Sequence, residues 1–202
     1  MEGLGLQRKS IRRVLCSVVL AAAPVAGIAL GATSAQAVTA DIGAGTLTIQ
    51  APSTFVWNNP SPGQTVVVTL PVIVTDATGS GNGWNADASM TTFRDATTGK
   101  AVTATVKLNG STSGGTATVG PTARCAVGST CKLPVPSTSA VTYPHVVPIG
   151  TPAPTATPFA TAADRTGMGI IDMPFDAWLR LTSSASDGAY TTSFIVSIVS
   201  GP

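Results

Sequence analysis

The chain has 202 residues, a formal net charge of +2 and only 10% charged residues, with 21 glycines and 15 prolines. After residue 37 it carries seven Lys or Arg against eight Asp and no Glu, so the positive charge belongs to the start of the chain. That balance excludes the basic surface expected of a nucleic-acid or anionic-membrane binder. Abundant Thr, Val, Gly and Ser, with few good helix formers, disfavours a helical fold.

The first segment has the three parts of a secretory signal peptide over residues 1–37. Basic Met1–Arg13 is followed by apolar Val14–Ala32 and by the small-residue triplet Ala35-Gln36-Ala37. We expect cleavage before Val38 and a secreted protein, extracellular or associated with the cell wall, with no membrane span after cleavage. The apolar stretch is also just long enough to cross a bilayer, so retention as an N-terminal anchor is the alternative.

Short stretches rich in β-branched residues then recur along the chain, separated by Asn, Gly, Pro and Ser. This spacing predicts an all-β fold, an Ig-like or Greek-key β-sandwich of short antiparallel strands, as a single domain over residues 38–202. In the last stretch the alternation places Phe194, Val196 and Ile198 on one apolar face. The expected strands are Gly45–Ala51, Gln64–Asp76, Trp84–Phe93, Ala101–Leu108, Trp178–Ser183 and Ala189–Val199.

Residues 112–167 differ from the rest of the chain. Pro, Thr, Ser and Ala recur there without sustained periodicity, as in Leu133-Pro134-Val135-Pro136. We expect a long Pro/Thr-rich insertion, extended and rich in loops, with polyproline-like or edge-strand segments.

Cys125 and Cys131 are the two cysteines that remain after residue 37. An even pair in an exported protein predicts a disulfide. A metal site would need further Cys or His ligands, and the sequence offers a single histidine, His145. Redox chemistry is the other alternative, but the spacing is not Cys-x-x-Cys. We therefore expect no metal and no cofactor.

Residues suited to catalysis are few. His145 lies between Pro144 and a Val-Val-Pro segment, where we expect a surface loop rather than a member of a Ser-His-Asp triad. Asp172 and Asp176 are candidates for a glycosidase acid/base pair, although Met173-Pro174-Phe175 between them indicates a turn or the start of a strand. The run Gly79–Gly83 lacks the Lys-Ser/Thr of a phosphate-binding loop. We expect that the protein is not an enzyme.

Both ends of the predicted domain resemble a known family. Thr75–Ala88, a Gly-rich turn that leads into Trp84-Asn85-Ala86, resembles the first signature of the WxL domain. The ending Tyr190–Pro202 resembles the second signature, a Tyr- and Thr-rich final strand. Ala86 stands where that family has leucine, and Val196-Ser197-Ile198 replaces its second Trp-x-Leu, so the likeness is to a divergent WxL-like surface protein of Gram-positive bacteria.

The resemblance implies a C-terminal β-rich domain that holds exported proteins non-covalently on the Gram-positive cell wall. The function we expect is therefore a secreted or cell-surface module that binds a cell-wall polymer, peptidoglycan. The alternative is a structural or assembly protein that pairs with another surface protein through an edge strand.

Candidate wall-binding residues follow from the two signatures. An exposed Trp84 would stack on sugar rings while Asn82, Asn85 and Asp87 bind their polar edges, and the ending adds Tyr190. The alternative interpretation places Trp84 in the sandwich core, because alternation puts it on one face with Ala86, Ala88 and Met90. In that case the outward residues of the strand are Asn85, Asp87, Ser89 and Thr91. Trp57 and Trp178 stay open between core and surface.

Overall fold

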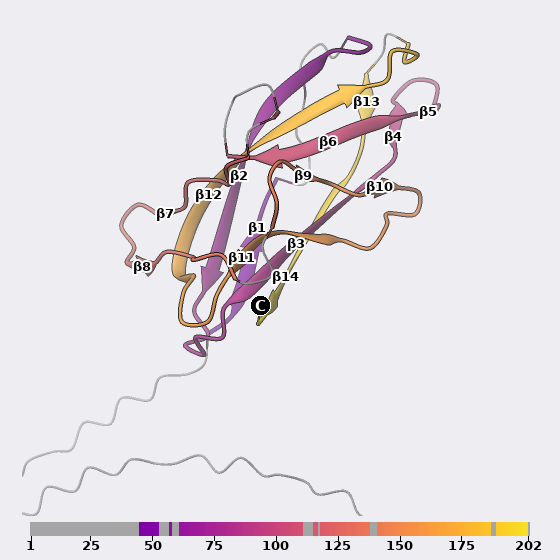
Figure 1. The fold of residues 1–202 in the computed structure, drawn as a ribbon. Coiled ribbons are helices and arrows are strands. Elements are labelled where there is room, and N and C mark those ends of the chain that lie inside the picture. Colours follow the sequence, from indigo (N-terminus) through magenta and orange to yellow (C-terminus); the bar gives the residue numbers. More distant parts are fainter. Residues whose placement is uncertain are drawn as a thin grey trace, which may run out of the picture. The chain divides into compact units, whose positions relative to one another are not determined.

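A computed structural model describes residues 45–52, 57, 61–110, 115–116, 118–137, 141–186 and 189–201. The predicted signal peptide, residues 1–37, lies outside these residues. Every regular element of the described chain is a strand, as Figure 1 shows, and the fold is the expected all-β sandwich. In this described part no helix has the length and apolar character needed to cross a membrane.

The larger sheet is built around the long strand β12, which is antiparallel to all its neighbours. One edge of β12 pairs with β2, and β1 pairs with the far side of β2. The other edge pairs first with β8 and β7 and then with β6, which in turn pairs with β9. The strands are β1 (Leu47–Gln50), β2 (Thr65–Asp76), β6 (Ala104–Asn109), β7 (Arg124–Cys125), β8 (Cys131–Lys132), β9 (His145–Val146) and β12 (Met168–Leu181).

The smaller sheet is built around β3, which pairs with β14 on one edge and β11 on the other. A third sheet, of β13, β4 and β5, continues the smaller sheet, because β4 follows β3 along the chain and β13 precedes β14. β5 then leads directly into β6, so this corner joins the two layers. The strands are β3 (Trp84–Thr91), β4 (Phe93–Asp95), β5 (Ala101–Val102), β10 (Ile149–Gly150), β11 (Thr157–Ala162), β13 (Tyr190–Thr191) and β14 (Phe194–Ser200).

Strand β12 is much longer than the predicted Trp178–Ser183, and the interpretation of Met173-Pro174-Phe175 as a turn or strand start was wrong. Pro174 lies directly opposite Pro71 of β2. Neither proline has an N–H, so both suit a register position where no hydrogen bond joins the opposed pair. On the other edge of β12, the pairing with β7 ends at Asp172 and that with β6 begins at Asp176. Pro174 therefore falls where the ladder is interrupted.

The predicted insertion, residues 112–167, includes a strand of the sandwich. β7 to β10 are two-residue strands within it, in agreement with a loop-rich segment. β11 is an edge-strand segment of the expected kind, because it ends one side of the smaller sheet, and its Phe159, Ala160 and Ala162 are buried. Its outward face is also covered, since Thr161 Oγ1 accepts a hydrogen bond of 3.1 Å from the Ser137 N–H. Burial on both faces removes the polar alternation by which a strand is recognised.

The core lies between the two sheets and contains aromatic residues from both. Phe159 of β11 meets Phe175 of β12 edge to face, with ring centroids 5.1 Å apart, and Trp57 lies 5.8 Å from Phe93. Alternation in β14 follows the prediction: Phe194 is buried while Ile195, next to it, is exposed. Side chains from both layers thus form one apolar interior.

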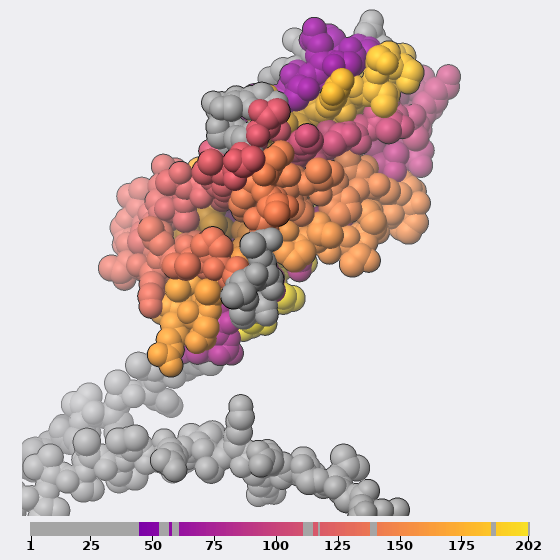
Figure 2. Space-filling view, viewed as in Figure 1, coloured from indigo at the N-terminus to yellow at the C-terminus, as the bar shows by residue number. Residues whose placement is uncertain are grey.

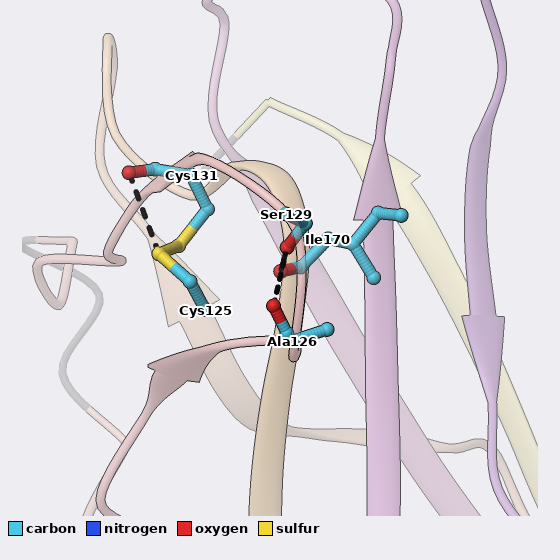
Figure 3. The surroundings of a disulfide bond; sticks show 5 residues. All are labelled: Cys125, Ala126, Ser129, Cys131 and Ile170. Carbon is cyan, nitrogen blue, oxygen red and sulfur yellow. Dashed lines mark hydrogen bonds between the residues drawn. A yellow bond between two sulfur atoms is a disulfide. The ribbon is translucent and has the colours of Figure 1, made fainter.

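The predicted disulfide joins Cys125 of β7 to Cys131 of β8, with sulfur atoms 2.05 Å apart. Figure 3 shows the hairpin beside β12. In the turn, the Ser129 hydroxyl donates to the Ala126 carbonyl (2.8 Å) and to the Ile170 carbonyl of β12 (3.3 Å). The Ala126 N–H also donates to Ile170, at 3.0 Å. The disulfide therefore closes a small hairpin that is already attached to the central strand.

Replacing both Cys125 and Cys131 by serine should lower the free energy of unfolding by about 2 kcal/mol, because a short loop is no longer closed in the unfolded chain. Urea titrations of the oxidised wild type and the double variant, followed by circular dichroism, give this difference. The two proteins should have the same native spectrum. A difference below about 0.5 kcal/mol would contradict the chain-entropy account for this loop.

Candidate ligand-binding site

Trp84 belongs to the core, so its interpretation as a sugar-stacking residue was wrong. Its side chain is 0% exposed. The indole Nε1–H donates to the Gly167 carbonyl at 2.8 Å, and no face of the ring is open to a ligand. The alternation that placed Trp84 with Ala86, Ala88 and Met90 was right, since all four are buried.

The other predicted wall-binding residues are divided between separate places. Asn82 is exposed in the turn before β3, and its backbone N–H donates to Ser80 Oγ. Asn85 and Asp87 are half-buried on the outer face of the smaller sheet, opposite in orientation to Trp84. Tyr190 lies in the third sheet, opposite Asp95. These residues do not converge on one site.

Three of these side chains have distinct environments. Asn85 Nδ2 donates to the Gly201 carbonyl at 3.1 Å, which ties β3 to the chain after β14. Partial burial raises the pKa of the Asp87 carboxyl. The Tyr190 hydroxyl donates to the Ser186 carbonyl four residues earlier. The hydrogen bonds to Gly201 and Ser186 therefore hold Asn85 and Tyr190 in separate parts of the fold.

Asp172 and Asp176 are on the outer face of β12, but each has its own partner. Arg124 donates to Asp172 through Nε (2.9 Å) and Nη2 (2.7 Å), and Thr69 Oγ1 donates to Asp176 at 3.1 Å. Four residues along one strand separate their backbones by about 13 Å. An inverting glycosidase holds its carboxyl groups about 6.5–9.5 Å apart. The geometry does not favour an acid/base pair.

His145 is in strand β9 and not in a surface loop as expected. Its ring is half-buried, and Nε2 lies 3.2 Å from the Thr157 hydroxyl. Burial lowers the pKa of its imidazole. Across the described residues no group of three or more His, Cys, Asp or Glu side chains has a metal-binding arrangement.

One cavity combines an aromatic ring with hydroxyl groups and cations. It lies on the outer face of the larger sheet and has a volume of about 300 Å³. We name it the Trp178 pocket, and it is lined by Thr65, Thr105, Lys107, Gly115, Thr116, Trp178 and Arg180.

Strand pairing places these side chains together. Trp178 of β12 is opposite Lys107 of β6, and Arg180 is opposite Thr105. On the other edge of β12, Thr65 of β2 is opposite Arg180. Alternation along each strand points all five side chains to the outer face, because the intervening residues of β12 and β6 face the core. Three strands therefore supply the floor of the pocket.

Trp178 is held in one orientation. Its Nε1–H donates to Asn109 Oδ1 at 3.2 Å, and its side chain is only 8% exposed. Gly115 covers part of the ring so closely that a Cβ there would lie 2.9 Å from Trp178 Cγ. The exposed remainder of the indole forms a fixed apolar strip at the cavity wall.

A second, larger cavity of about 660 Å³ has a different character. Among the residues that line it are Val119, Leu133, Tyr143 and Met173, with several prolines. Burial raises the pKa of Tyr143 to about 12, and its hydroxyl donates to the Phe159 carbonyl. The face seen in Figure 2 is formed largely by the red to orange segments that flank this cavity. Its lining contains no charged side chain, unlike the Trp178 pocket.

Comparison with known proteins adds no relative: no family model, curated protein or solved structure matches this chain. The site therefore rests on its geometry alone. The sequence contained part of the information needed to find this pocket, since Thr105 and Lys107 share a face of one predicted strand and Trp178 and Arg180 share a face of another. It did not contain the pairing of those strands.

Proposed function

We propose that the protein is a secreted or cell-surface module that binds a polymer of the Gram-positive cell wall, such as peptidoglycan, without a covalent link. The observation that carries this proposal is the Trp178 pocket, where an indole edge adjoins hydroxyl and cationic groups. The resemblance of Thr75–Ala88 and Tyr190–Pro202 to the WxL signatures supports the same function. So does the predicted leader.

The chemistry of the pocket suits a sugar. Apolar C–H groups of a pyranose can pack against the exposed edge of the indole, and the Thr65 and Thr105 hydroxyls can both donate and accept hydrogen bonds with ring substituents. Its volume is at the lower end of the usual range for ligand pockets, roughly 300–1,000 Å³. The fixed orientation of Trp178 reduces the ordering cost of binding.

The proposal is tested by sedimentation of the protein, produced from its full sequence, with purified Gram-positive cell walls. In the variant Thr105→Tyr a larger side chain fills the pocket, and tyrosine is well tolerated in strands. We expect its apparent Kd to rise at least tenfold. The matched control, Thr48→Tyr, is on the same outer face, in the edge strand β1, and should bind like the wild type.

The same experiment separates the alternative function. Failure of the wild type to sediment with walls would overturn wall binding. If the protein then formed oligomers with rising concentration, assembly through an edge strand would be favoured. The observation behind this alternative is that β14 exposes Ile195 (44%) and Val199 (50%) on its outer face, at one side of the smaller sheet.

A further inference from the structure

We infer that the Trp178 pocket recognises an anionic group of the wall polymer, a phosphodiester or a carboxylate, through Lys107 and Arg180. This inference rests on the proposed function and names the chemistry of its ligand. The two cations are on adjacent strands, and both side chains line the one cavity. Since Arg180 is opposite Thr105, Lys107 is its diagonal neighbour, with backbones about 7–8 Å apart.

The positive charge of the pocket is not neutralised within the described part of the chain. The ion pairs found there join Arg124 to Asp172 and Arg165 to Asp164, and neither includes Lys107 or Arg180. No acidic residue lines the cavity. After residue 37 the chain has one more Asp than it has Lys and Arg together. Two cations around one cavity are therefore a local concentration of positive charge on a chain that is slightly negative there.

The nearest carboxylate along β12 lies outside the pocket. Asp176 precedes Trp178 by two residues, so the indole stands between Asp176 and Arg180 on the outer face. Asp176 is itself only 7% exposed and accepts a hydrogen bond from Thr69. Asp176 is a diagonal neighbour of Lys107, as Arg180 is, but it does not line the cavity, and the ion pairs of the described residues do not join it to Lys107.

The arrangement also has the donors that an oxoanion needs. The guanidinium of Arg180 presents a planar fork to two oxygens, and the ammonium of Lys107 is a compact charge with three donors. Thr65 and Thr105 lie on either side of Arg180 in register and can add hydroxyl donors. The Trp178 strip excludes water from one side, which strengthens these contacts.

The test compares Lys107→Gln/Arg180→Gln with a control that loses the same charge elsewhere, Arg94→Gln/Lys132→Gln. All four positions project from strands, and both control side chains are exposed. We expect the apparent Kd for intact walls to rise at least tenfold in the pocket variant. The control should stay within twofold of the wild type. The apparent Kd of the wild type should also rise as the NaCl concentration increases, and that of the pocket variant should rise less.

Chemically altered walls identify the source of the anion. Hydrofluoric acid removes phosphodiester-linked polymers, and carbodiimide with an uncharged amine converts carboxylates to amides. We expect at least one treatment to weaken wild-type binding tenfold or more, and that treatment names the group. This inference would be overturned, and wall binding left intact, if the wild type bound untreated, acid-treated and amidated walls equally and the pocket variant bound untreated walls as tightly as the wild type. No binding to any wall would overturn both.

Discussion

Replacing Trp84 by alanine is expected to lower the free energy of unfolding by about 4 kcal/mol, because the core loses the largest fully buried side chain among the described residues. The indole packs against Ala162 and Gly167, and its N–H satisfies the Gly167 carbonyl. Truncation leaves a cavity and a buried acceptor without its donor. Urea unfolding followed by circular dichroism measures the effect.

The variant Trp84→Phe is the matched control. It keeps an aromatic ring in the core and loses the hydrogen bond and part of the volume, so we expect a loss of about 1–2 kcal/mol. If Trp84→Ala were as stable as the wild type, Trp84 would not be a core residue. Weaker wall binding by Trp84→Ala would be explained by unfolding, so Trp84 is unsuitable as a probe of the ligand site.

The strands of the sandwich could be predicted where one face is buried and the other meets solvent. β2, β3 and β14 alternate in this way, and their predicted positions agree with the structure. β11 agrees with the expected edge-strand segments, but its bounds could not be predicted, because residues on both of its faces are buried. The first part of β12 was missed because Pro174 was interpreted locally, whereas the interruption that accommodates it depends on where β6 ends and β7 begins.

The candidate site was harder to predict than the fold. The resemblance directed attention to Trp84, whose side chain packs in the core. Trp178 and Arg180 meet Lys107 only through the register between β12 and β6, which are far apart in the sequence. Alternation within one strand shows which of its residues share a face, but it does not show which other strand pairs with that strand in the sheet. The pocket therefore required the structure.

Replacing Gly167 by alanine is expected to destabilise the fold by about 3 kcal/mol, since overpacking and a left-handed backbone both cost free energy. Gly167 has φ +69°, and a Cβ there would lie 2.5 Å from Trp84 Nε1 and 2.5 Å from Ala162 Cβ. Gly79 provides the control, because its φ of +66° is nearly the same and a Cβ would meet nothing within 4 Å. Gly79→Ala should cost only about 1 kcal/mol.

The two glycine variants separate backbone strain from contact with the indole. Both place alanine at a similar positive φ, but only Gly167→Ala brings a methyl group against Trp84. Equal losses in urea unfolding would show that φ alone accounts for the effect, and the close approach to Trp84 would then have no energetic weight. Combining Gly167→Ala with Trp84→Phe extends the test. Phenylalanine lacks the Nε1 atom that the new methyl group meets, so the double variant should lose less stability than the sum of the single variants. If the losses in stability of the two single variants simply added, the strain would come from the contact with Ala162. Its Cβ is fixed to the backbone and cannot move aside as a flexible side chain can.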